Sequence, residues 1–128
     1  MKKFSKFWIK SKKPSKQRKY RKNAPLHLVS KLMNVHLSKD LKKKYSRRSL
    51  RVRKDDVVKI MRGQFKKKSG KVTDVNLFRK KVFVEGIQQI RKDGTKSFYP
   101  LEPSNLVITS LDLSDKERKL KLEKKNAS

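Results

Sequence analysis

The chain contains no cysteine among its 128 residues. This absence excludes disulfides, thiolate zinc sites, cysteine nucleophiles and iron–sulfur clusters. Nothing in the composition therefore indicates an oxidising compartment, and we expect an intracellular, cytoplasmic protein.

Long apolar runs are also missing. No run approaches the roughly 20 residues that a membrane helix needs. The N-terminal stretch MKKFSKFWIKSKKP begins with positive charge but holds only Phe7-Trp8-Ile9 before the next lysine, which is far short of a signal-peptide apolar region. The aromatic-faced amphipathic helix that would support binding to a membrane surface is absent too. We therefore expect no membrane partner.

Acidic residues are few, with 11 Asp and Glu against 39 Lys and Arg and a net charge of +28. Such a chain repels itself unless an anionic partner supplies the counter-charge, and the natural partner is a polyphosphate. The excess is uneven: residues 1–54 hold 21 Lys and Arg and one acid, residues 55–111 hold 12 and 6, and residues 112–128 hold 6 and 4. This distribution predicts a basic extension over 1–54, a domain over 55–111, and a C-terminal helix and tail over 112–128.

Helix signals occur on both sides of the predicted domain. Pro14-Ser15 followed by KQRKYRK predicts a short basic helix from about Lys16 to Lys22, which has no apolar stripe and cannot pack on protein alone. Apolar residues between Pro25 and Leu37 fall close to helical spacing, and Ser38 is then expected to cap a helix over KDLKKKY. Ser114-Asp115-Lys116-Glu117 has the pattern of a capping box, so a C-terminal helix is predicted with Ser114 as its cap.

From Asp56 onward, the spacing of the apolar residues changes from helical to strand-like. The runs DVVKIMR, KVTDVNL, KVFVEGI, SFYPL and NLVIT are short, β-branched or aromatic, and spaced as in a small all-β barrel. Asp93-Gly94 predicts a hairpin turn between the third and fourth runs. Closure into a barrel would leave no open edges. The predicted fold is mainly β, a small barrel with a basic, partly helical N-terminal extension and a short C-terminal helix.

The stretch RGQFKKKSGKV resembles at first sight a phosphate-binding loop for a nucleotide. A P-loop needs four residues between its glycines and a hydroxyl residue after Gly-Lys. Here six residues separate Gly63 from Gly70, and Val72 occupies the hydroxyl position. The following KVTDVNL also alternates like a strand instead of opening a helix. We therefore predict a strand, a basic hairpin loop and a strand, in which glycine serves positive φ or close backbone approach and the lysines contact phosphates.

No catalytic or metal site is indicated. His27 and His36 are nine positions apart without a nearby Cys or acid pattern, so no metal site is predicted. Asp55 and Asp56 are adjacent carboxylates at the start of a strand, but they lack a His or Lys base arranged for chemistry. We expect them to fix a turn or to pair with a neighbouring cation, Arg53 or Lys54. The chain is predicted to be no enzyme, with no cofactor and no small-molecule substrate.

The segment RKDDVVKIMRGQFKKKSGKV resembles the KOW motif of small SH3-like barrels in ribosomal and transcription-elongation proteins. Its flanks, KQRKYRKNAPLHLVSKLMNVHLSKDLKKKYSRRSLRVRK before it and VFVEGI, DGTK and PSNLVITSLDLSDKERK after it, are similar to the archaeal and eukaryotic branch of the universal large-subunit ribosomal protein number twenty-four, which eukaryotes number twenty-six. The chain departs from the family at Asp55 and Lys67, where relatives usually have glycine.

The resemblance implies a structural protein of the large ribosomal subunit with an SH3-like barrel. It further implies direct binding to the 5′ domain of large-subunit ribosomal RNA, contacts with neighbouring ribosomal proteins, an early role in subunit assembly, and a location near the polypeptide exit tunnel. The predicted RNA-binding residues lie in the basic helix, before the barrel and in the KOW hairpin. They are Lys12, Lys13, Lys16, Gln17, Arg18, Lys19, Arg21, Lys22, Arg47, Arg48, Arg51, Arg53, Arg62, Gly63, Lys66, Lys67, Lys68, Gly70 and Lys71.

Two alternative functions, and two alternative roles for the N-terminal aromatic residues, stay open at this point. A KOW-type transcription-elongation or RNA-chaperone factor usually carries larger folded domains, for which this chain has no room. A chromatin-like protein would bind duplex DNA as well as it binds RNA. Phe4, Phe7 and Trp8, which alternate with lysines, either stack on unpaired bases or belong to a disordered tail.

Overall fold

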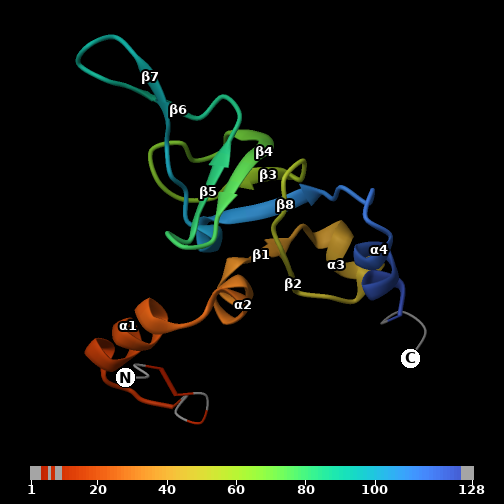
Figure 1. The fold of residues 1–128 in the computed structure, drawn as a ribbon. Coiled ribbons are helices and arrows are strands. Elements are labelled where there is room, and N and C mark those ends of the chain that lie inside the picture. Colours follow the sequence, from red (N-terminus) through yellow and green to blue (C-terminus); the bar gives the residue numbers. More distant parts are fainter. Residues whose placement is uncertain (1–3, 6, 8–9, 125–128) are drawn as a thin grey trace.

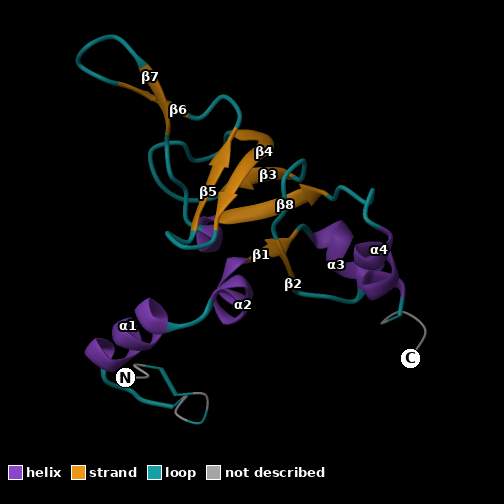
Figure 2. Ribbon diagram, viewed as in Figure 1, coloured by secondary structure: helices purple, strands orange, loops and turns teal. Residues whose placement is uncertain are grey.

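The structure is a computed structural model that describes residues 4, 5, 7 and 10–124. A six-stranded sheet in the order β2-β1-β8-β3-β4-β5 occupies the middle of the molecule, and the hairpin β6-β7 projects from it (Figures 1 and 2). The strands are β1 (Asn34–Leu37), β2 (Ser49–Arg51), β3 (Val57–Ile60), β4 (Ser69–Asn76), β5 (Lys81–Val84), β6 (Gln88–Ile90), β7 (Lys96–Phe98) and β8 (Leu106–Ser110). The helices are α1 (Pro14–Asn23), α2 (Leu26–Val29), α3 (Lys39–Tyr45) and α4 (Lys116–Glu123), with 3-10 turns η1 (Ser30–Met33) and η2 (Pro103–Asn105).

One face of the sheet forms the core. Alternate residues of a strand point to the same face, and the buried residues follow this period of two in β1, β3, β5 and β8. The core is one cluster of Met33, Val35, Leu37, Val52, Val58, Ile60, Val72, Val82, Val84, Ile87, Leu101, Leu106 and Ile108. Residues on both sides of position 54 therefore share a single hydrophobic core.

The prediction of a helix between Pro25 and Leu37 is wrong for the last four residues, which form a strand. The chain forms α2 and η1 and then enters β1, which pairs antiparallel with β2 and parallel with β8. Val35 and Leu37 are fully buried, whereas His36 between them is half-buried. Four residues with apolar side chains at every second position fit a short strand, and pairing with two neighbours decides the conformation over the local helical spacing.

The strands predicted from Asp56 onward are confirmed for β3, β4, β5 and β8, each of which overlaps a predicted run, although β4 begins two residues earlier than its run. The hairpin turn at Asp93-Gly94 is confirmed too, with the Arg91 amide donating to the Thr95 carbonyl at 2.8 Å and Gly94 at φ +86°. The first strand of this hairpin, β6, follows the run KVFVEGI instead of belonging to it. The described residues form a strand-rich sheet together with helices, which is compatible with the predicted mainly β small domain.

A closed barrel requires the two edge strands of the sheet to pair with each other. Among the described residues, the outer strands β2 and β5 do not pair with each other, so closure into an SH3-like barrel stays a prediction. One contact ties β5 back toward β8: Val82 and Leu101 exchange two backbone hydrogen bonds of 2.9 Å. Leu101 precedes η2, which leads directly into β8.

One predicted helix cap is confirmed and two are wrong. The first helix, α1, already begins at Pro14 with Lys13 at its cap position, so Pro14-Ser15 does not cap it. Ser38 caps α3 as expected, because its hydroxyl accepts from the Leu41 amide at 3.4 Å. The C-terminal helix α4 begins one residue later than predicted, with Asp115 as the cap accepting from the Glu117 amide at 3.0 Å. Ser114 instead donates its hydroxyl proton to Asp112. A carboxylate accepts an amide hydrogen bond more strongly than a hydroxyl does, which explains the shift.

The two glycines of RGQFKKKSGKV serve the two purposes predicted for them. Gly63 has φ +97° and nothing close to the position of a Cβ. Gly70 lies where β4 approaches the end of β5, and a Cβ there would stand 2.6 Å from the Glu85 carbonyl oxygen and 2.8 Å from the Val84 side chain. Gly63 thus provides conformational freedom, and Gly70 provides close approach.

Gly70→Ala should lower the free energy of unfolding by about 1–3 kcal/mol, because the new methyl group must displace backbone. Gly63→Ala should cost about 1 kcal/mol, since only the left-handed backbone conformation opposes it. Urea unfolding of the two variants compares them directly. Equal losses in both would show that β4 and β5 can separate freely at Gly70.

Candidate nucleic-acid interface

The loop between β3 and β4 presents a lysine cluster on a closed, anchored turn. Its base is held by two backbone hydrogen bonds, from the Lys67 amide to the Ile60 carbonyl at 2.9 Å and from the Ile60 amide to the Lys68 carbonyl at 2.8 Å. Phe65 packs edge-on against Tyr99 with ring centroids 4.9 Å apart, and the Lys68 ammonium lies 5.3 Å from the Phe65 ring centroid. The predicted contacts Arg62, Lys66, Lys67 and Lys68 are all exposed. The loop therefore offers cations in a fixed arrangement.

Both positions where relatives usually carry glycine have a left-handed backbone. Asp55 has φ +69° and Lys67 has φ +71°. Aspartate tolerates this region comparatively well, and Asp55 also accepts an ion pair from Lys71 at 2.9 Å. Lysine has no such local compensation, so Lys67 holds about 1 kcal/mol of backbone strain in the middle of the cationic loop.

Lys67→Gly should raise the free energy of unfolding by up to about 1 kcal/mol, because it relieves the left-handed strain. It should also weaken RNA binding and flatten its salt dependence by roughly 0.7–0.9 on a log–log scale, the share of one phosphate contact. Chemical denaturation and a salt titration give the two readouts.

Lys66→Gly is the matched control, since Lys66 does not share the positive φ. This variant should lose stability by about 0.4–1 kcal/mol through the added freedom of its unfolded chain. Raised RNA affinity for Lys67→Gly would show that strain in the loop outweighs the charge of Lys67.

A second group of predicted residues surrounds a polar hollow beside β2. The hollow has a volume of about 250 Å³ and is lined by Lys31, Asn34, Arg47, Ser49, Leu50, Arg51, Arg53, Arg118 and Lys121. Arg47 donates to the Lys121 carbonyl at 2.6 Å, which fastens the chain after α3 to α4. Within the described part of the chain, the buried Nε of Arg47 has no hydrogen-bond partner. Six of the lining residues are cations, of which Arg53 and Arg118 are paired with acids. The others fit a phosphate group, which accepts several such hydrogen bonds. Arg48 is exposed and is not part of the lining.

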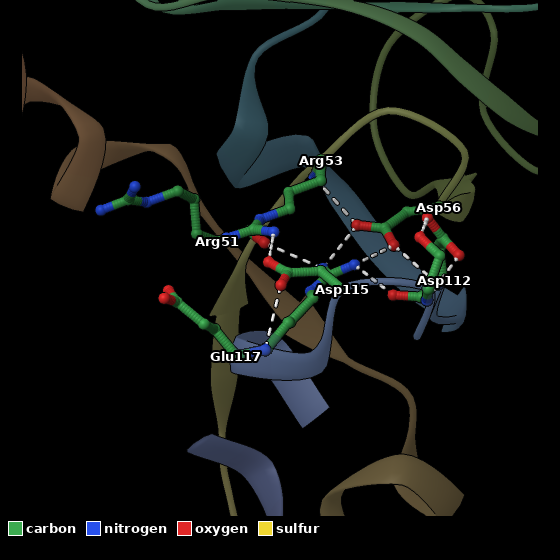
Figure 3. A network of polar contacts seen from close by, with 8 residues as sticks. Arg51, Arg53, Asp56, Asp112, Asp115 and Glu117 are labelled. Atoms are coloured by element: carbon green, nitrogen blue, oxygen red, sulfur yellow. Dashed lines mark hydrogen bonds and ion pairs between the residues drawn. The ribbon is translucent and has the colours of Figure 1, made fainter. Parts of the chain in front are cut away.

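One lining residue of this hollow, Arg118, belongs to a buried ion pair with Asp56, and Figure 3 shows the polar network around Asp56. Arg118 donates to both carboxylate oxygens of Asp56, at 2.6 and 2.7 Å, and both side chains are buried. Asp56 also accepts from the backbone amides of Arg53 at 2.9 Å and Asp112 at 3.0 Å. Arg118 in turn donates to the carbonyls of Asp112 and Arg51. The network fastens α4 to the start of β3 and to the end of β2, so it fixes the walls of the hollow.

Asp55 and Asp56 were expected to fix a turn or to pair with Arg53 or Lys54. The turn is confirmed, but the expected ion-pair partners are wrong. Asp56 closes the turn by accepting from the Arg53 amide, but its ion-pair partner is Arg118, and that of Asp55 is Lys71. Local sequence favours a neighbour, whereas the actual partners are brought together by the fold.

Besides Lys81, which pairs with Glu102 at 2.6 Å, three cations at or beside the basic regions are paired with acids. Arg53 contacts Asp115 and holds the pKa of that carboxyl below its usual range, mainly through their hydrogen bond. The hydrogen bond from Lys71 to Asp55 raises the pKa of Lys71. Lys54 pairs with Asp74 at 3.1 Å. Arg53 and Lys71, both predicted RNA contacts, are thus each paired with an acid of the protein itself.

The basic helix α1 is confirmed and buries no residue. Its predicted contacts are exposed except for Gln17, which is half-buried and donates to the Ser11 carbonyl at 2.6 Å. Phe4 stacks at a tilt on Tyr20 with centroids 5.0 Å apart, and Phe7 is 97% exposed. Trp8 lies outside the described residues. The exposed cations of this region are Lys12, Lys13, Lys16, Arg18, Lys19, Arg21 and Lys22.

Sequence reasoning missed residues that only the fold brings to these surfaces. Lys31, Arg118 and Lys121 join the hollow beside β2. Phe78 and Lys80, in the turn between β4 and β5, join the C-terminal half of α1 at a second hollow. A sequence signal existed only for Phe78, because a large aromatic residue is unusual within a polar turn.

The described residues were also searched for groups that could hold a metal ion and for helices that could span a membrane. No group of three His, Cys, Asp or Glu side chains in residues 4, 5, 7 and 10–124 is placed to hold a metal ion. None of the helices formed by these residues has the length and apolar character needed to span a membrane.

Comparison with known families gives a match that covers the three basic regions, namely α1, the segment around β2 and the loop between β3 and β4. The model of a family described as the eukaryotic ribosomal proteins L26 and their archaeal counterparts, number twenty-four, matches residues 11–125. The match includes α1, the arginines around β2, the loop between β3 and β4, and α4. Since it spans nearly the whole chain, the protein belongs to this family of eukaryotic and archaeal ribosomal proteins.

Proposed function

We propose that this protein is held in the large ribosomal subunit by direct contacts of its three basic regions with large-subunit ribosomal RNA. As a member of its family it is a structural, non-enzymatic component of that subunit. The observation that carries the proposal is the surplus of exposed cations. The 11 acids cannot neutralise 39 Lys and Arg, and five of those acids are engaged in ion pairs inside the protein.

In the proposed mechanism, each of three parts of the chain has its own role in RNA binding. The exposed cations of α1 and of the segment around β2 contact the RNA backbone and neutralise phosphates, which releases condensed counterions. The domain over residues 55–111 is an SH3-like barrel that scaffolds the KOW loop, and the hydrogen bonds between Val82 and Leu101 support this closure. The C-terminal part packs Arg118 under the hollow beside β2 and so positions its arginines. Phosphate contacts of this kind fix position and orientation.

Family membership supports the finer parts of the proposal. We place the binding site in the 5′ domain of large-subunit ribosomal RNA, near the polypeptide exit tunnel and beside other ribosomal proteins in the cytoplasm. On the same ground of family membership, we propose that the protein acts early in assembly of the subunit.

Sedimentation of cell lysate tests the proposal against its rival, a KOW-type transcription or RNA-chaperone factor. The protein should migrate with the large subunit in a one-to-one ratio. A protein found free or with RNA polymerase would contradict the proposal. Competition with duplex DNA tests the second rival: ribosomal RNA should displace the DNA, because RNA offers loops and shapes that a duplex lacks.

A further inference from the structure

The hollow between α1 and the β4–β5 turn combines an apolar floor with a cationic rim. It has a volume of about 410 Å³, within the range of roughly 300–1,000 Å³ of small-ligand sites. Its lining residues are Arg18, Arg21, Lys22, Ala24, Leu26, Val29, Phe78 and Lys80. The Lys80 ammonium donates to the Arg21 carbonyl at 3.0 Å, a contact across 59 positions of sequence that joins the turn to the end of α1.

Phe78 is not needed by the turn that carries it. The Asn76 side chain accepts from the Arg79 amide at 2.9 Å, the Lys80 amide donates to the Leu77 carbonyl at 3.3 Å, and Lys80 has φ +57°. These backbone features define the turn without any contribution from the phenyl ring. The ring is 83% exposed, and Leu26 across the hollow is 56% exposed. Two large apolar side chains exposed on one hollow indicate a binding surface.

The rim of the hollow favours an anion. Arg18, Arg21, Lys22 and Lys80 stand around it, and no acid is among its lining residues. Burial lowers the pKa of Lys80, and the charge of Arg21 lowers it further, so the cations repel one another at close range. A phosphate placed between them would relieve this repulsion.

We propose that this hollow binds one unpaired nucleotide of the RNA, with the base stacked on Phe78 and a flanking phosphate on the cationic rim. The inference rests on the proposed function and makes it more specific. A base offers a flat π-face that stacks on aromatic side chains, and its phosphate supplies the negative charge. A duplex keeps these faces hidden inside its own stack. A protein partner would have to bring both an apolar group and acids to the same place, whereas every nucleotide carries both features.

The test compares two short RNA duplexes that differ by a single bulged adenosine, bound to the full chain at elevated salt. The wild-type protein should prefer the bulged duplex. Phe78→Ala should weaken binding to the bulged duplex by roughly 5- to 150-fold, the usual effect of removing one stacking partner, and leave the fully paired duplex unaffected. Phe78→Trp should keep the preference. Lys22→Gln should weaken binding to both duplexes, since it removes a phosphate contact.

Phe98→Ala is the matched control, because Phe98 is an exposed aromatic residue on the separate hairpin β6-β7. It should change binding to neither RNA, and circular dichroism should confirm that each variant is folded. Two results would overturn the inference: equal losses on both duplexes for Phe78→Ala, or full retention of the bulge preference in Phe78→Leu, which keeps apolar bulk but has no ring. A wild-type protein that binds neither duplex would instead contradict the proposed function.

Discussion

Asp56→Ala should lower the free energy of unfolding by about 3–5 kcal/mol, the usual cost of breaking a buried ion pair from one side. Removal of the carboxylate leaves the buried guanidinium of Arg118 without its counter-charge. It also removes the acceptor for the amides of Arg53 and Asp112. Marginal stability makes such a loss large enough to unfold part of the population. Urea unfolding followed by circular dichroism measures it.

Two variants show whether the buried pair is responsible. Asp74→Ala removes an exposed carboxylate that also pairs with a cation, Lys54, and should change the free energy of unfolding far less. The double variant Asp56→Ala with Arg118→Leu should recover part of the loss, because no charge is then left buried. If Asp56→Ala costs no more than Asp74→Ala, the network does not hold α4 to the sheet.

Binding of the protein to large-subunit ribosomal RNA should weaken steeply with salt. If ten of the Lys and Arg residues contact phosphate, the log–log slope is roughly −7 to −9. The triple variant with Gln at Arg18, Lys19 and Lys22 should flatten this slope by roughly 2–3. If the affinities converge near 1 M salt, the variant binds roughly 100- to 1,000-fold more weakly at about 0.1 M. Filter binding over a range of salt concentrations gives the slope.

The matched control replaces Arg91, Lys92 and Lys96, three exposed cations of the projecting hairpin β6-β7, with Gln. It removes the same charge from a part of the molecule outside the three basic regions, so the slope should stay unchanged. A slope shallower than about −3 for the unaltered protein would contradict the extended-contact mechanism. Equal flattening in both triple variants would mean that net charge alone drives binding.

The elements predicted correctly are those whose signals are local. The alternating runs of β3, β4, β5 and β8, the turn at Asp93-Gly94 and the cap at Ser38 each depend on a few neighbouring residues. The roles of Gly63 and Gly70 followed from the same kind of reasoning, because a basic hairpin needs both freedom and close approach.

The features missed depend on contacts between distant residues. β1 is only four residues long, and its spacing also fits a helix until β8 pairs with it. Asp56 and Arg118 are 62 positions apart, and no local pattern pairs them. The hollow at Phe78 likewise needs α1 to meet a turn that lies more than fifty positions later. The candidate site was therefore predictable as three basic regions, whereas its hollows required the fold.

Crosslinking in purified large subunits tests direct ribosomal RNA binding most directly. After ultraviolet irradiation, the RNA adducts are sequenced and the attached peptides are identified. We predict adducts with large-subunit ribosomal RNA on peptides from α1, from residues 47–53 and from the loop between β3 and β4. Adducts confined to other RNAs, or a protein that stays in the subunit without any RNA adduct on these peptides, would contradict direct binding through the three basic regions.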